Sequence, residues 1–137
     1  MEDAAHYDLD IEQQSLLMLT QRVRERFEQA GPLLPDVDLT NLTLNEANFF
    51  KFVVPELIQH SAASVTWHRL LLAHNGLSFP ACNFLIEFLL KNCTNLEELS
   101  LANNNLGDQS MEILASFVNQ AKTELSNVSR VCAVLSI

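Results

Sequence analysis

The fold is decided by two stretches that match position by position, WHRLLLAHNGL at residues 67–77 and LEELSLANNNL at residues 96–106. Both follow the pattern LxxLxL, with Trp67 in place of the first leucine in the earlier stretch. The last two leucines of the pattern are two positions apart, so they point to the same face of a short strand. The spacing of 29 residues between the stretches predicts parallel strands near Leu70–Leu72 and Leu99–Leu101.

Each predicted strand is followed by residues with helical periodicity. Pro80 marks the start of the first helix, and Asp108 is a candidate N-cap for the second. The second helix has one apolar stripe, formed by Met111, Ile113, Leu114, Phe117 and Val118. One strand and one helix cannot bury their apolar faces alone, whereas stacked copies of such a unit bury a continuous core. We therefore predict an α/β solenoid with its helices on the convex side.

An asparagine stands just after each strand, Asn75 in the first stretch and Asn104 in the second. The backbone turns sharply there and leaves amide groups without strand partners. A short amide side chain can hydrogen-bond these groups from inside the turn. We therefore interpret both asparagines as structural residues.

A further copy of the unit is expected 28 residues upstream. Leu42 and Leu44 then align with Leu70 and Leu72, and Ala47 takes the place of the asparagine. This alignment predicts the first strand of the sheet at Leu42–Leu44.

The two ends of the chain depart from the pattern. A last copy would begin near Leu125 or Val128, without a clear register. Apolar residues recur at helical spacing between Asp10 and Gln29, and Gly31-Pro32 follows as a stop signal. We expect this amphipathic helix to cap the first unit of the solenoid.

Three arginines, Arg22, Arg24 and Arg26, form a small basic cluster in the predicted N-terminal helix. One interpretation is a solvated face paired with Glu25 and Glu28. The other is a docking site for an acidic partner.

The stretch LEELSLANNNLGDQSMEILASFV at residues 96–118 resembles a leucine-rich repeat of the ribonuclease-inhibitor-like class. The resemblance covers Leu39 to about Val118 and implies a solenoid with one parallel strand and one full helix in each repeat. Similar repeats occur in the sensor regions of immune receptors, in tropomodulin-like proteins and in effectors of intracellular bacterial pathogens. We expect an N-terminal capping-helix region at 1–36, about three repeats at 37–121, and a partial fourth repeat or improvised C-terminal cap at 122–137.

The composition argues against several classes of partner. The chain has 137 residues and a net charge of −9, so we expect neither nucleic acid nor a membrane surface as a partner. No apolar run approaches the roughly 18–20 residues of a transmembrane helix, and the acidic start MEDAAHYDLDIEQQ is unlike a signal peptide. Cys82, Cys93 and Cys132 are widely spaced, which favours free thiols in the cytoplasm or another reducing compartment. If the chain is a bacterial effector, we expect it to be delivered into a host cell.

The sequence offers few candidates for catalysis or metal binding. His6, His60, His68 and His74 are scattered, without the i, i+4 spacing of a helical metal pair. The chain has no GxSxG, no HExxH and no glycine-rich phosphate loop. Cysteines at buried apolar positions have raised pKa values and are inert. We therefore expect no enzymatic activity, no metal and no cofactor.

The remaining candidate is the concave surface of the predicted sheet. Residues between the inward-pointing leucines face this surface. They include Arg69, Leu71, Glu98 and Ser100, with His68 beside them. In the first predicted strand, the same rule selects Asn41, Thr43 and Asn45. An exposed leucine between charged groups can anchor a partner within a polar rim, and the competing interpretation is an unoccupied surface.

Two functions stay open at this point. The first is a non-catalytic module that binds a protein partner through the concave parallel sheet. The second is a truncated or regulatory end of a larger effector or receptor protein, with its activity outside this chain, as the apolar ending VSRVCAVLSI suggests. A strand formed by that ending would be open on one side, so we also expect self-association through the C-terminal edge.

Overall fold

The computed structural model of the chain describes residues 11–30, 36–93, 95–124 and 132–134. Helices and short strands alternate along these residues. In chain order the elements are α2 (Ile11–Gln29), β1 (Asp36–Asp38), α3 (Glu46–Asn48), the π-helical turn η1 (Phe49–Val53), α4 (Val54–Gln59), the 3-10 turn η2 (Ala63–Thr66), β2 (Arg69–Leu71), α5 (Phe79–Asn92), β3 (Glu98–Ser100), α6 (Gly107–Glu124) and β4 (Cys132–Val134).

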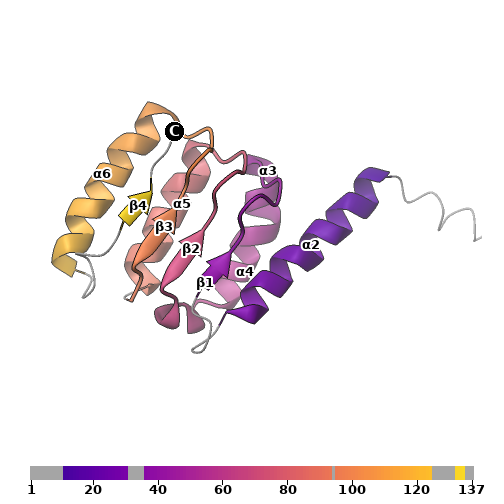
Figure 1. The fold of residues 1–137 in the computed structure, drawn as a ribbon, viewed down its shortest axis with the longest axis horizontal. Coiled ribbons are helices and arrows are strands. Elements are labelled where there is room, and N and C mark those ends of the chain that lie inside the picture. Colours follow the sequence, from indigo (N-terminus) through magenta and orange to yellow (C-terminus); the bar gives the residue numbers. More distant parts are fainter. Residues whose placement is uncertain (1–10, 31–35, 94, 125–131, 135–137) are drawn as a thin grey trace, which may run out of the picture.

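The strands form one small parallel sheet in the order β1-β2-β3-β4. Leu70 pairs with Leu99, which is the register that the 29-residue spacing predicts. The predicted strands at Leu70–Leu72 and Leu99–Leu101 are therefore confirmed to within one residue. Helices α4 and α5 lie behind the sheet in Figure 1, α6 lies beside β4 at the left, and the front face of β1, β2 and β3 carries no helix. The fold is thus a mixed α/β arrangement with an open parallel sheet.

The core fills the space between the sheet and the helices behind it. The central residue of each of the first three strands, Val37, Leu70 or Leu99, is fully buried. Their strand neighbours on either side are only partly buried or exposed, as expected for a sheet with one covered face. The largest buried side chains are Trp67, Phe27, Phe49 and Phe117.

The prediction for the first strand is wrong. Strand β1 lies at Asp36–Asp38 instead of Leu42–Leu44, and Val37 is the residue that pairs with Leu70. Leu42 and Leu44 are buried in the turn that follows β1. The segment from β1 to β2 spans more residues than a 28-residue spacing allows, because it includes the π-helical turn η1 and the 3-10 turn η2.

The first residues of helices α4 and α5 lie next to prolines, whereas the N-cap predicted for α6 does not form. Pro80 lies in the first turn of α5, and Pro55 lies in the first turn of α4. Proline fits there because a helix leaves its first amide groups unbonded. The N-cap predicted at Asp108 is wrong, because α6 already begins at Gly107 and Asp108 lies in its first turn. A carboxylate at that place still favours the helix, since it faces the positive end of the helix dipole.

The predicted N-terminal helix is confirmed as α2 and packs at the β1 side of the sheet. It contacts β1, η1 and α4. Leu19, Val23 and Phe27 form its buried stripe. The Phe27 ring lies 5.6 Å from the ring of His60 and 5.7 Å from that of Trp67, measured between centroids. Gly31 and Pro32 lie outside the described residues.

The described helices give no membrane-spanning candidate, because none of them combines the necessary length with the necessary apolar character.

Candidate functional site

The open face of the sheet carries two rows of side chains that cross three strands. The pairing register sets Asp36, Arg69 and Glu98 side by side, and we call these three residues the charged row. Two positions further along the strands, the register sets Asp38, Leu71 and Ser100 side by side, and we call these the leucine row. Since side chains alternate along a strand, both rows point away from the helices.

Arg69 connects the three strands of the charged row. Its Nε atom lies 3.7 Å from Glu98 Oε1 and 4.0 Å from Asp36 Oδ1. The side chains of Arg69, Asp36 and Glu98 remain 55%, 41% and 31% exposed. Exposed ion pairs contribute little to stability, about 0–1 kcal/mol. The row is therefore accessible to another molecule.

A second ion pair lies where β2 and β3 begin. His68 Nδ1 is 3.5 Å from Glu97 Oε2, and both side chains are partly exposed. The backbone supports this corner, because the amides of Glu97 and Glu98 both donate to the His68 carbonyl oxygen. All five residues predicted from the sequence therefore lie on or directly beside this face of the sheet.

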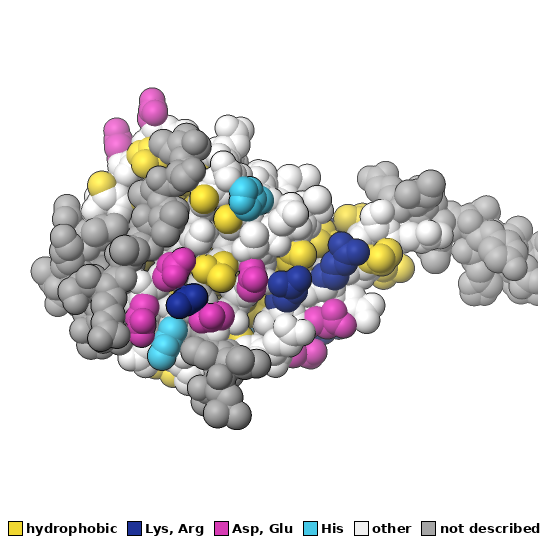
Figure 2. Space-filling model, in the orientation of Figure 1, with side chains coloured by type: hydrophobic (Ala, Val, Ile, Leu, Met, Phe, Trp, Pro, Cys, Tyr) yellow, Lys and Arg dark blue, Asp and Glu magenta, His cyan; other side chains and the backbone are white. Residues whose placement is uncertain are grey.

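Asp38 forms an ion pair with Arg26 of α2. Arg26 Nη1 donates to the Asp38 carbonyl oxygen at 2.9 Å and lies 3.9 Å from the carboxylate Oδ2. The Thr40 amide donates to the other carboxylate oxygen, Oδ1, at 3.0 Å. Figure 2 shows acidic side chains around a basic one on the face over the strands, with hydrophobic side chains among them.

Leu71 is half-buried in the leucine row, whereas the sequence suggested an exposed side chain. Past the end of β2 the same alternation leads to Ala73, which is buried, and past the end of β3 it leads to Ala102, which is partly buried. Small apolar side chains therefore follow Leu71 at this end of the face.

The asparagines perform the structural task that the sequence predicts. Asn75 Oδ1 accepts from the amides of Leu42 and Leu44, each at 3.0 Å, and its Nδ2 donates to the carbonyl oxygens of Leu39 and Leu72. Asn104 makes the corresponding bonds, with Oδ1 accepting from the Leu77 amide at 3.0 Å. The bonds of Asn104 Nδ2 go to the carbonyl oxygens of Leu72, Leu101 and Ala102. Each asparagine thus joins its own turn to the turn before it.

Cys82 and Cys93 are buried, free thiols. Burial raises the pKa of Cys82 to about 11, against a lowering hydrogen bond with Ser110 and a further rise from Glu46. Burial raises the pKa of Cys93 to about 12, against a lowering hydrogen bond with Ser64. Both thiols therefore stay protonated at neutral pH, a form that is a poor nucleophile.

The histidines of the described chain lie apart from one another. His60 Nε2 is 3.5 Å from Glu56 Oε1, and His74 Nδ1 is 3.1 Å from Asn103 Nδ2. Among the described residues, no group of three His, Cys, Asp or Glu side chains is placed to hold a metal ion. His6 lies outside those residues.

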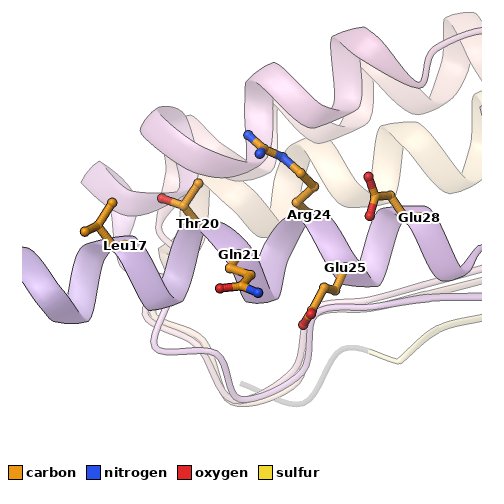
Figure 3. A pocket seen from close by; sticks show the side chains of 6 residues that line it. All are labelled: Leu17, Thr20, Gln21, Arg24, Glu25 and Glu28. Carbon is orange, nitrogen blue, oxygen red and sulfur yellow. The ribbon is translucent and has the colours of Figure 1, made fainter.

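Several shallow hollows of the surface follow helix α2. Figure 3 shows one of them, about 460 Å³, whose six lining side chains all belong to that helix, namely Leu17, Thr20, Gln21, Arg24, Glu25 and Glu28. A hollow along one side of a single helix has no opposing wall. It therefore offers a small molecule little enclosure.

The basic cluster of α2 is paired differently from the expectation. Arg24 Nε lies 3.4 Å from Glu56 Oε2 of α4, and Arg26 lies against Asp38 of β1. The expected pairing of these arginines with Glu25 and Glu28 is wrong. The actual partners belong to neighbouring elements, so these arginines hold α2 against the rest of the fold.

Family models, curated proteins and solved structures give no match to this chain. The site is therefore interpreted from its own residues.

Sequence reasoning missed the β1 side of the face. It selected Asn41, Thr43 and Asn45, but the residues that pair with β2 on the open face are Asp36 and Asp38. The signal was present, because Val37 and Leu39 show the same two-residue alternation as Leu70 and Leu72. The later pair, Leu42 and Leu44, shows it too, and the 28-residue alignment selected that pair.

Proposed function

We propose that this chain is a non-catalytic protein-interaction module that holds a protein partner on the open face of its parallel sheet. The observation that carries the proposal is the pair of rows crossing three strands. Charged groups of both signs lie next to the half-buried Leu71, an arrangement of polar rim and apolar centre found in protein interfaces.

We further propose that the fold is a leucine-rich-repeat solenoid of the ribonuclease-inhibitor-like class. Support comes from the order of strand, asparagine turn and helix, which the chain follows at β2 and again at β3. The equivalent bonds of Asn75 and Asn104 across successive turns agree with this assignment. In this interpretation α2 covers the first strand as an N-terminal cap.

The shape of the face favours a protein over a small molecule as the partner. The charged row and the leucine row lie on a surface built from short strands, with exposed side chains from three of them. Small ligands are bound in concave, mostly enclosed sites, whereas proteins are bound on extended surfaces.

We also propose that the protein works in a reducing compartment. Cys82 and Cys93 are free and buried, and their protonated thiols are suited to the core of a protein that forms no disulfide there.

Site-specific photo-crosslinking in cells of the source organism tests the interaction. A benzophenone amino acid at Ser100 reports on the open face, and the same group at the exposed Asn83 of α5 reports on the helical side as the matched control. We expect a discrete protein adduct from position 100 and none from position 83.

The double variant Arg69→Glu, Leu71→Asp should stay folded by circular dichroism and lose the adduct at position 100. An adduct that persists in the folded double variant, or forms only at position 83, would place the interface elsewhere and refute the proposal.

A further inference from the structure

We infer that the partner presents an extended segment in which a basic and an apolar side chain stand two positions apart, the basic one on the charged row and the apolar one on Leu71. This inference rests on the proposed function and specifies the partner's chemistry.

The charge balance of the face favours a basic partner. Four carboxylates lie on or beside the face, those of Asp36, Asp38, Glu97 and Glu98. Two guanidinium groups, those of Arg26 and Arg69, lie among them. Even with His68 counted as a positive charge, these four carboxylates outnumber the three basic groups that lie against them. Interfaces pair such a patch with the opposite sign.

The carboxylates of the charged row retain acceptor capacity. Arg69 Nε lies 3.7 Å from Glu98 and 4.0 Å from Asp36, whereas charge-assisted hydrogen bonds are about 2.7–2.9 Å long. A carboxylate has about four lone-pair positions, so one distant guanidinium leaves room for another donor. A partner's arginine or lysine can donate to the lone pairs of Glu98 or Asp36 that Arg69 leaves free, without displacing Arg69.

The second contact lies one row away. Leu71 follows Arg69 by two residues on β2, so the two side chains are about 6.6 Å apart along the strand at roughly 3.3 Å per residue. Residues i and i+2 of an extended partner have the same separation and share a face. An extended segment running between β2 and β3 therefore places its basic residue beside Glu98 and its apolar residue beside Leu71, and so matches both rows at once.

Charge also argues against a second copy of this chain as the occupant. Two copies placed face to face would each bring an excess of carboxylates, and like charges at an interface are costly. The chain as a whole has a net charge of −9, which adds to the repulsion.

A titration of the 15N-labelled protein followed by amide chemical shifts tests the inference. The probe is a peptide with threonine at every second position. The positions between the threonines carry arginine and leucine in turn, so an arginine and a leucine stand two positions apart. Two control peptides replace either arginine by glutamate or leucine by serine. We expect shifts of the amides of Arg69–Leu71 and Glu98–Ser100 with the probe, and at least about tenfold weaker binding of each control. Raising the salt from about 50 to about 300 mM should weaken probe binding by screening.

Matched variants separate the face from general charge attraction. Asp36→Asn with Glu98→Gln should weaken probe binding about tenfold, and Glu25→Gln with Glu28→Gln, which removes the same charge from exposed positions of α2, should change it less than about twofold. The inference would be overturned if both pairs weakened binding equally or if the shifts were confined to other surfaces. It would also be overturned if the glutamate peptide bound more tightly, or if the protein formed face-to-face dimers without peptide. If position 100 still forms its adduct while the probe fails to bind, the proposed function stands and the basic partner does not.

Discussion

At the scale of single residues, the turn asparagines matter most for the geometry of the face. Asn104 Nδ2 and Oδ1 together join the backbone of its own turn to that of the preceding one. Such bonds set where each strand ends. They therefore also set the lateral alignment of the charged row and the leucine row.

Asn104→Ala should lower the free energy of unfolding by about 1–3 kcal/mol, because it leaves backbone groups in the turn without partners. The neighbouring Asn105 has an exposed side chain, so Asn105→Ala should stay within about 0.5 kcal/mol of the wild type. Urea melts of the two variants make the comparison. Equal losses would show that the side-chain bonds of Asn104 contribute no specific stability.

The buried thiols predict a pH dependence of stability. The pKa of Cys93 is raised from 9.0 to about 12 in the folded chain, so the native state keeps a proton that the unfolded state loses above pH 9. The free energy of unfolding should therefore be unaffected by this group below pH 9 and fall progressively as the pH rises toward 12. Urea melts at pH 8 and pH 10 measure the change, and Cys93→Ala should reduce the slope. A Cys93→Ala variant with the full wild-type slope would assign the effect to other groups.

At the scale of elements, α2 is attached to the fold through the part of its length between Leu19 and Phe27. Phe27 is 1% exposed and contacts Trp67, whereas Leu17, nearer the start of the helix, is 62% exposed. Arg24 and Arg26 add ion pairs with α4 and β1 in the same part of the helix. The element is thus held where it adjoins β1, which keeps Arg26 beside the open face.

Phe27→Ala should cost about 3–5 kcal/mol, since it removes a fully buried ring from between α2 and the core. Leu17→Ala on the same helix should change stability by less than about 0.5 kcal/mol. Thermal and urea denaturation measure both. A small effect of Phe27→Ala would mean that α2 contributes little to the stability of the fold.

At the scale of the whole molecule, the sheet remains open at its last strand. In the described part of the chain, β4 has β3 as its sole strand partner. An unpaired strand edge is a template for pairing with another chain. The sequence predicts that a last copy of the repeat begins near Leu125 or Val128, and both residues lie outside the described ones. The strand Cys132–Val134 does form.

We expect the protein to self-associate through this edge, and we expect a variant without residues 128–137 to be monomeric. Sedimentation velocity over a range of concentrations measures both. A full chain that is monomeric at every concentration would refute self-association through the C-terminal edge.

Local pattern was sufficient for strands β2 and β3, for the helices that follow them and for both turn asparagines, because these features recur in matching stretches 29 residues apart. Arg69, Leu71, Glu98 and Ser100 could be placed on one face for the same reason, since alternation along a strand depends only on sequence.

The position of β1 was decided by tertiary structure. Val37–Leu39 and Leu42–Leu44 have the same apolar alternation, and the pairing with β2 selects the first. Leu42 and Leu44 lie in the turn instead, where their amides donate to the side-chain oxygen of Asn75, more than 30 residues further along the chain. Asp36 and Asp38, and with them the excess of negative charge on the face, follow from that long-range contact and from no local pattern.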